Sequence, residues 1–216
     1  MKQPRSADQV EAVKEAILEN ALDIIVKHGL DGLTMRALAA RVNMTAPNLY
    51  NYYSGKDEIY LSLVVKGFGM LRDELRAAFD RHSDSLERAR AMMEAYLEFG
   101  MQRPRYYDIM FTLSTPKYRD YLGTDYEALS EKEYLISMEI VDLVVKAVTG
   151  LTGTGADDQT ILPRVVQVWS LLHGMVSLHN SDVISYVVED VNSIYQKTVR
   201  EIVENASALL DTARTG

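Results

Sequence analysis

The chain has 216 residues, of which 47% are hydrophobic and 25% are charged, and its formal net charge is −8 at pH 7. This composition is that of an ordinary globular protein with a sizeable core. It contains no cysteine, which excludes disulfides and thiolate metal sites. The sequence has no run of about eighteen apolar residues that could span a membrane, and its N-terminus lacks the apolar region of a signal peptide. We therefore expect a cytoplasmic protein without membrane contact.

The acidic charge is unevenly distributed. Residues 1–60 contain seven Lys or Arg and eight Asp or Glu, a net charge of −1, so −7 falls on residues 61–216. Residues 33–56 contain three basic side chains and no acidic one. DNA affinity depends on cations near the phosphates more than on total charge. The negative total therefore does not exclude a DNA-binding protein.

The first predicted helix follows a capping pattern. Ser6 and Gln9 have the spacing of a capping box, and apolar residues then recur at helical spacing to about His28. Gly29 is predicted to end this helix, because glycine takes a positive φ without strain.

A short second helix is predicted within residues 33–56. Thr34 is its N-cap candidate, and Leu38 and Ala39 lie on its inward side. Asn43 follows as a left-handed turn residue, since its short polar side chain tolerates positive φ. The pattern predicts a helix followed by a tight turn.

The third predicted helix begins at Thr45 as N-cap, with Pro47 in its first turn. Leu49 and Tyr53 are four residues apart, so they share one face and pack inward. The opposite face carries small, amide and phenol groups without an acid: Ala46, Asn48, Asn51 and Tyr52, with Tyr50 at its edge. The two short helices predict a helix-turn-helix whose second helix enters the major groove.

The expected roles in DNA binding follow from position. Side chains near the N-terminus of a recognition helix reach deepest into the groove, so the base-contact candidates are Ala46, Pro47, Asn48 and Asn51. Asn can bond adenine twice, and Ala or Pro can lie against a thymine methyl group. The phosphate candidates are Thr34, Arg36, Thr45, Tyr50, Tyr52 and Lys56. The tyrosines could instead pack between helices, which we expect for Tyr53, leave open for Tyr50 and do not expect for Tyr52.

These residues carry a family resemblance. The pattern T-x-R-x-L-A-x-x-x-N from Thr34 to Asn43, followed by L-Y-x-Y-Y-x-x-K-D-E from Leu49 to Glu58, resembles the DNA-binding domain of the tetracycline repressor (TetR) family of transcriptional regulators. The resemblance covers about the first sixty residues closely and implies the same split between base and phosphate contacts. Gly55 departs from the Ser or Pro-Ser that often precedes the lysine in this family, but it still serves as an N-cap.

The remaining chain is predicted to be helical throughout. Further helices are expected over residues 56–79, 85–103, 105–115, 126–149, 160–180 and 188–210. The predicted fold is all-α, with a DNA-binding domain of residues 1–55 and a helical effector-binding and dimerisation domain of residues 56–216. Gly67 and Gly69 fall inside one helix, where they mark a bend or a close packing contact.

Tyrosine and methionine are dense between residues 92 and 138. Such side chains suit a pocket for an apolar or aromatic small molecule, although an ordinary helical core has the same spacing. The family resemblance implies a ligand cavity in this region. The effector-contact candidates are Met93, Tyr96, Tyr107, Met110, Phe111, Met138, Trp169 and His173.

The sequence W-x-x-x-H-G at residues 169–174 resembles the C-terminal domain of one branch of the same family. Gly174 would permit a close approach of helices, and Trp169 would be a large anchor. Two helices from each subunit would then form a four-helix interface about a two-fold axis, the alternative being burial within one chain. We expect a homodimer, because a single helix-turn-helix reads few base pairs.

An enzyme is not predicted. His173 and His179 are six residues apart and therefore lie on different faces of a helix, and no nucleophile elbow occurs. No cofactor or metal is expected. We predict a transcriptional regulator, a repressor released from a palindromic operator by a small-molecule effector. The alternative is a helical protein-interaction module that retains a degenerate helix-turn-helix.

Overall fold

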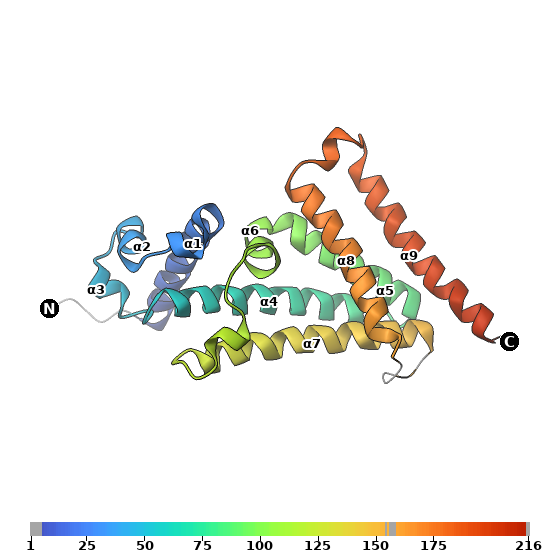
Figure 1. Ribbon diagram of the computed structural model, residues 1–216, viewed down its shortest axis with the longest axis horizontal. Helices are drawn as coiled ribbons and strands as arrows, with labels where there is room; N and C mark the ends of the chain where they lie inside the picture. Colours follow the sequence, from blue (N-terminus) through green and yellow to red (C-terminus); the bar gives the residue numbers. More distant parts are fainter. Residues whose placement is uncertain (1–5, 154, 156–158, 215–216) are drawn as a thin grey trace. The chain divides into compact units, whose positions relative to one another are not determined.

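A computed structural model describes residues 6–153, 155 and 159–214 (Figure 1). Within these residues every regular element is a helix and no strand occurs, which confirms the all-α prediction. The elements are α1 (Ala7–Gly32), α2 (Met35–Arg41), α3 (Ala46–Leu49), α4 (Lys56–Arg81), α5 (Ser85–Gln102), α6 (Pro104–Tyr107), the π-helix η1 (Asp108–Thr112), the 3₁₀ helix η2 (Tyr118–Tyr121), α7 (Glu127–Thr152), α8 (Ile161–Asn180), the 3₁₀ helix η3 (Ile184–Tyr186) and α9 (Val191–Arg214).

The chain forms two compact units. The first contains residues 1–69 and 105–136, and the second contains residues 70–104 and 137–216. Helices α4 and α7 each contribute residues to both units. An independently folding domain that ends at residue 55 therefore stays a prediction.

The start of α1 has the predicted capping box. The Gln9 N–H donates to the Ser6 hydroxyl at 3.3 Å, and the Ser6 N–H donates to the Gln9 side chain at 3.0 Å. Gly29 takes the predicted positive φ of 71°. The first regular helix therefore ends at about His28 as predicted, and one more helical turn follows this kink and continues to Gly32. The extra turn delivers Leu33 into the core as a fully buried side chain.

The core of the first unit is built from α1 and α4. Its fully buried members include Ile17, Leu22 and Ile25 of α1 and Ile59 and Leu63 of α4. Tyr60 is also buried, and its hydroxyl lies 2.9 Å from the Thr115 hydroxyl and 2.9 Å from the Pro116 carbonyl oxygen. Burial raises the pKa of Tyr60 to about 12, against the opposing effect of the Thr115 hydrogen bond.

In the second unit α5 is the central helix, since both α8 and α9 pack against it. Asp84 caps its N-terminus by accepting the Glu87 N–H at 2.9 Å. The Asn180 side chain donates to the Gly100 carbonyl at 3.1 Å, which joins α8 to α5. The Tyr195 hydroxyl donates to the Met175 carbonyl at 2.8 Å, which joins α9 to α8.

The two glycines inside α4 differ in their surroundings. A Cβ atom at Gly67 would lie 2.5 Å from the Met110 sulfur and 3.2 Å from a Tyr106 ring carbon, so this glycine permits close packing of α6 and η1 on α4. A Cβ atom at Gly69 would have no described atom within 4 Å.

Opposite effects on stability are therefore expected at these two positions. Gly69→Ala should raise the free energy of unfolding by about 1 kcal/mol, because alanine favours the helix over glycine by about this amount. Gly67→Ala should lower it by about 1–2 kcal/mol, since the added methyl group displaces Met110 in a packed core. Urea unfolding at one protein concentration would test both, and equal effects of the two substitutions would contradict the packing role of Gly67.

Candidate nucleic-acid interface

The helix-turn-helix is set by short-range caps. The Ala37 N–H donates to the Thr34 hydroxyl at 3.1 Å at the start of α2, and the Asn48 N–H donates to the Thr45 hydroxyl at 3.4 Å at the start of α3. Asn43 has a φ of 54° between the two helices. The predicted caps and the predicted turn residue are therefore confirmed.

Helix α3 is shorter than predicted, because it ends at Leu49. The amides of Asn51 and Tyr52 donate to carbonyls three residues earlier, at 3.2 and 2.9 Å, so the chain tightens into turns instead of continuing the helix. The predicted inward pair is still formed, since Leu49 and Tyr53 are both buried. The turns place Tyr50 outward, with 53% of its surface exposed.

The predicted DNA-contact side chains are accessible to differing degrees. Exposed members are Thr34, Arg36, Thr45, Pro47, Tyr50 and Asn51, and half-buried ones are Ala46, Asn48, Tyr52 and Lys56. The Asn51 amide nitrogen lies 3.5 Å from the Asn48 side-chain oxygen, so the two amide groups are neighbours. This surface has donors, acceptors and cations but no carboxylate of its own.

The start of α4 carries two acidic side chains, Asp57 and Glu58, next to the phosphate candidate Lys56. Glu58 accepts from the Ser54 N–H at 2.6 Å and from the Ser54 hydroxyl at 2.8 Å. Lys56 lies 3.7 Å from the carboxylate of Asp31, a contact in which the Asp31 side chain is fully exposed. Such an exposed pair is weak, so the Lys56 ammonium remains available to another anion.

Two tyrosines from the segment between η1 and α7 contact this helix start. The Tyr121 hydroxyl donates to Asp57 at 3.0 Å, and the Tyr126 hydroxyl lies 3.4 Å from the Ser54 hydroxyl. Burial and the Asp57 charge raise the pKa of Tyr121 above its usual range. A Cβ atom at Gly55 would lie 2.8 Å from the Tyr126 hydroxyl, so glycine at this position lets the connection pack closely.

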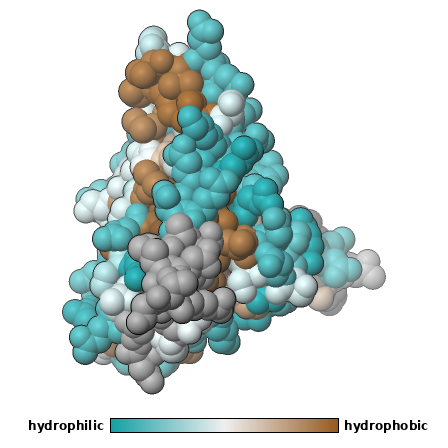
Figure 2. Space-filling model, turned by 90° about the vertical axis from the view of Figure 1, so that its right-hand side faces the viewer, coloured by the Kyte–Doolittle hydropathy of each residue, from teal (hydrophilic) through white to brown (hydrophobic). Residues whose placement is uncertain are grey.

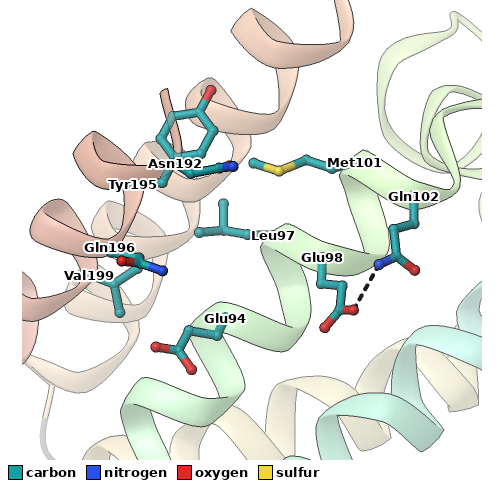
Figure 3. Close-up of a pocket in the computed structure, with 9 residues that line it drawn as sticks. All are labelled: Glu94, Leu97, Glu98, Met101, Gln102, Asn192, Tyr195, Gln196 and Val199. Carbon is teal, nitrogen blue, oxygen red and sulfur yellow. Dashed lines mark hydrogen bonds between the residues drawn. The ribbon is translucent and has the colours of Figure 1, made fainter. Parts of the chain in front are cut away.

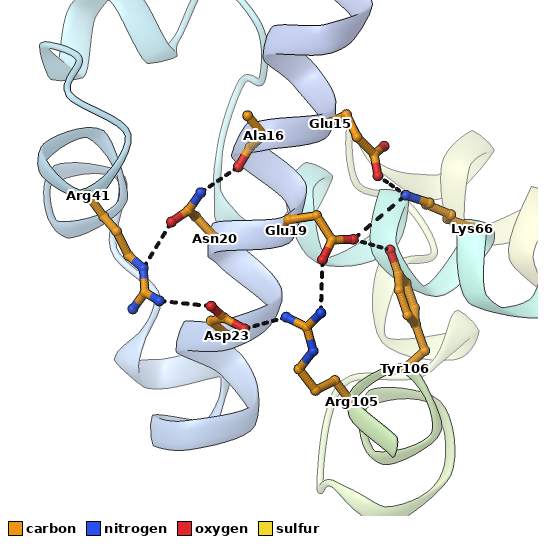
Figure 4. A network of polar contacts seen from close by, with 9 residues as sticks. All are labelled: Glu15, Ala16, Glu19, Asn20, Asp23, Arg41, Lys66, Arg105 and Tyr106. Carbon is orange, nitrogen blue, oxygen red and sulfur yellow. Dashed lines mark hydrogen bonds and ion pairs between the residues drawn. The ribbon is translucent and has the colours of Figure 1, made fainter. Parts of the chain in front are cut away.

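A polar network, which the sequence did not predict, holds α1 to its neighbours (Figure 4). Asp23 is shared by two arginines: Arg41 of α2 donates to one carboxylate oxygen at 2.8 Å, and Arg105 of α6 donates to the other. Arg41 also donates to Asn20 at 3.0 Å. Arg105 donates to Glu19 at 3.1 Å as well. One face of α1 thus joins the helix-turn-helix to α6.

The same face of α1 also binds α4. Lys66 pairs with Glu15 and lies 3.8 Å from Glu19, which accepts from the Tyr106 hydroxyl at 3.1 Å. Burial alone would lower the pKa of Lys66, but its hydrogen bonds to Glu15 and Tyr106 raise it. The acids at positions 15, 19 and 23 are four residues apart. This spacing on one helix face is the signal by which sequence reasoning could have found the network.

The predicted effector contacts fall into two groups. Tyr107, Met110 and Phe111 belong to the first unit, where the Tyr107 and Phe111 ring centroids are 5.0 Å apart. The other five, Met93, Tyr96, Met138, Trp169 and His173, belong to the second unit. There the Trp169 indole N–H donates to the Tyr96 hydroxyl at 2.9 Å. A shared effector pocket stays a prediction.

No metal site is indicated in the part of the chain that the structure describes, where no cluster of three or more His, Asp or Glu residues is placed to hold an ion. An exposed helix-turn-helix with capped helices, joined to a large helical body, instead defines a DNA-binding regulator.

Family comparisons agree with this class. A family model described as "Bacterial regulatory proteins, tetR family" matches residues 17–63, and one described as "Tetracyclin repressor-like, C-terminal domain" matches residues 89–202. The chain belongs to the tetracycline repressor family. It is therefore a DNA-binding transcriptional regulator, and the alternative of a protein-interaction module is not supported.

Three curated relatives are regulators of the helix-turn-helix type. The chain is 26% identical over 166 residues to the uncharacterized regulator YobS of Bacillus subtilis, covering 76% of this chain and 78% of YobS. It is 28% identical over 95 residues to the activator FasR of Mycolicibacterium smegmatis, covering 44% of this chain and 43% of FasR. It is 22% identical over 159 residues to IcaR of Staphylococcus aureus, a negative regulator of the biofilm operon icaADBC, covering 74% of this chain and 83% of IcaR.

The fold is also found among solved structures. The regulatory protein SCO4313 superposes with a TM-score of 0.67 at 24% identity, covering 93% of this chain and 98% of that one. A TetR-family regulator from Bordetella parapertussis gives a TM-score of 0.71 at 14% identity, covering 89% of this chain and 94% of that one.

The shared carboxylate of Asp23 yields a stability prediction. Asp23→Asn should lower the free energy of unfolding by about 1 kcal/mol, because it weakens two partly exposed ion pairs at once. The deficit should shrink in 1 M salt, which screens such pairs. Glu11→Gln, an exposed change of the same charge on α1, is the control for urea unfolding. An equal loss in both variants would contradict the bridging role of Asp23.

Proposed function

We propose that this regulator is a homodimeric repressor that binds a palindromic operator and releases it when a small molecule binds its C-terminal helices. The acid-free, exposed surface of the helix-turn-helix is the observation that carries the DNA-binding part. The likeness to IcaR, named as a negative regulator, extends over 74% of this chain and supports repression, whereas the likeness to the activator FasR extends over 44%. Because the target is DNA, we place the protein in the cytoplasm and assign it no catalytic role.

The DNA contacts are proposed from position and chemistry. Ala46, Pro47 and Asn48 lie at the start of α3 and Asn51 lies on the turn behind it, where they can meet base edges. The cations and hydroxyl groups around them would bind phosphates and set the register: Thr34, Arg36, Thr45, Tyr50, Tyr52 and Lys56.

Selection of bound duplexes from a random pool, with purified protein at moderate salt, tests this proposal. A two-fold symmetric motif is expected, with half-sites about one helical turn (roughly 34 Å) or a multiple of it apart. A folded protein that selects no motif would overturn the assignment of a sequence reader.

Substitutions at two positions should separate positioning from sequence reading. Lys56→Ala should weaken binding to all duplexes and reduce the salt dependence by about one phosphate contact, because it removes a single cation. Asn48→Ala should mainly relax the preference at one base pair, by about 1–3 kcal/mol.

Fluorescence anisotropy with the selected operator and point-mutated operators would measure both effects. Lys197→Ala, which removes an exposed lysine from α9, is the matched charge control. If Lys56→Ala behaves like this control and Asn48→Ala retains full sequence preference, the docking geometry is wrong.

The proposed dimer rests on the surface of α8. Leu162, Val166 and Trp169 form a stripe one helical turn apart, and they are 59%, 52% and 46% exposed. Leu171 and Leu178 form a second exposed stripe seven residues apart. Gly174 lies between these stripes, and a Cβ atom there would have no described atom within 4 Å. The face between the stripes is therefore open to close approach by another helix.

The apolar surface continues beyond α8. Tyr186 and Val187, in the connection to α9, are 87% and 80% exposed. Figure 2 shows hydrophobic surface gathered at the top of the view, over this connection. A patch of this kind on a soluble domain marks an interaction site.

A membrane is the other environment that could cover α8. By length and composition alone, α8 is apolar enough to span a membrane. An 18-residue stretch of it has a mean hydropathy of 1.3, and only 22% of that stretch is buried. We favour a second subunit, because Arg164, Gln167 and His173 interrupt the apolar surface and a helix-turn-helix gains specificity by reading two half-sites.

A charge placed in this surface should separate the subunits. Val166→Glu should raise the dimer dissociation constant at least about a hundredfold, because an unpaired carboxylate would be buried in the interface. Leu86→Glu, an exposed site on α5, is the control. Sedimentation velocity would report the oligomeric state, and a Val166→Glu protein that remains dimeric at the wild-type concentration would contradict this interface.

Release by an effector would act through a two-state equilibrium. The two helix-turn-helix domains of the dimer, here called the reading heads, would have a different separation in each state. A ligand that prefers the state unable to bind the operator lowers the operator affinity, at most by the ratio of the ligand's affinities for the two states. Operator affinity that stays unchanged when a ligand saturates the C-terminal helices would contradict release, while leaving the DNA-binding assignment intact.

A further inference from the structure

A groove between α5 and α9 lies within the second unit and contains none of the predicted effector contacts (Figure 3). Its volume is about 390 Å³, within the range of small-molecule sites. Leu97, Tyr195 and Val199 form an apolar floor, and each is buried. Met101 adds a flexible apolar side chain at one end.

The polar rim of the groove is acidic on one side. Glu94 and Glu98 lie one turn apart on α5, and Gln102 follows on the same face. Gln102 donates to the Glu98 carboxylate at 2.8 Å, which fixes one of its oxygen atoms. Across the groove, Asn192 and Gln196 of α9 contribute amide groups.

Charge compensation within the groove is incomplete. None of its lining residues is Lys, Arg or His. Arg90, one turn before Glu94, is bound to Glu87, and Lys197 of α9 lies 3.9 Å from Glu201. The ion pairs of these two cations are with carboxylates outside the groove, although the charge of Glu94 also acts on Arg90. The lining itself carries two carboxylates and no cation.

We infer that this groove binds a small organic cation, a primary ammonium attached to an apolar or aryl body. The apolar body would cover Leu97, Tyr195 and Val199. The ammonium group has three donors and no acceptor, which matches a rim of two carboxylates and three amide oxygens. An anion would be repelled by the two carboxylates, and a neutral ligand would not compensate their charge.

Occupation of the groove has a route to regulation, and this part rests on the proposed function. Helix α9 is held to α8 by the hydrogen bond from Tyr195 to Met175, and Tyr195 is also part of the groove floor. A ligand wedged between α5 and α9 would shift the position of α9 at a residue that also contacts α8. Because α8 carries the proposed dimer surface, the separation of the two reading heads would respond.

The first test measures binding without DNA. Titration calorimetry with phenethylammonium, 2-phenylethanol and 3-phenylpropanoate compares one aryl body with positive, neutral and negative ends. At low salt the ammonium should bind about tenfold more tightly than the alcohol, and the carboxylate should bind most weakly. The preference for the cation should decline as salt is raised.

Substitutions then assign the preference to the groove. Glu94→Gln/Glu98→Gln should bring the ammonium and the alcohol to nearly equal affinity while circular dichroism shows an unchanged helix content. Asp142→Asn/Glu189→Gln changes the same charge at two exposed positions of the second unit outside the groove and should retain the preference. Equal binding of the three probes to the wild type, or an unchanged preference in Glu94→Gln/Glu98→Gln, would overturn the inference.

Operator binding is measured separately. If phenethylammonium binds in the groove and lowers operator affinity in the wild type but not in Glu94→Gln/Glu98→Gln, the groove is a regulatory site. If it binds and operator affinity is unchanged, the regulatory role is wrong and the ligand site stands. A failure to select any operator would count against the proposed function alone, because the calorimetry contains no DNA.

Discussion

The acidic face of α1 is the constraint on which the first unit depends. Asp23 can accept from Arg41 and Arg105 together only while α2 and α6 keep their positions on either side of α1. Glu19 likewise requires α4 and α6 to meet the same helix. The helix-turn-helix is therefore attached to its neighbours by hydrogen-bonded ion pairs as well as by apolar packing. The hydrogen bonds fix a direction, whereas apolar packing does not. A displacement of α6 would change the pairing available to α2.

The parts of the fold that were predictable from sequence depend on neighbours in the chain. The capping box of Ser6, the cap at Thr34 and the positive φ of Asn43 all involve residues within four positions of one another. Asp23 and Arg105 are 82 residues apart, and such a contact leaves almost no local pattern. The early end of α3 was missed for a related reason, because Leu49 and Tyr53 face inward in either conformation.

The candidate sites show the same division. The exposed residues of the helix-turn-helix could be predicted as DNA contacts from the sequence. The N-caps, the turn at Asn43 and the inward pair of Leu49 and Tyr53 together define which side faces outward. The sequence around the aromatic and methionine residues of the C-terminal helices does not show which of these side chains face a cavity. Those predicted to share a pocket belong to two compact units. The α5–α9 groove combines residues about a hundred positions apart, Glu94 and Gln196 among them. Only the packing of these helices brings such residues together.

The shortness of α3 limits how much sequence a single helix can recognise. Four residues at 1.5 Å per residue span about 6 Å, and stacked base pairs are about 3.4 Å apart along the duplex. The rigid helix of one protomer therefore covers about two base pairs. A longer half-site must be recognised by the turn that carries Tyr50 and Asn51, or through the shape of the DNA. Altered specificities should accordingly be sought across residues 45–52, with Leu49 kept constant as the anchor that fixes this segment to the core.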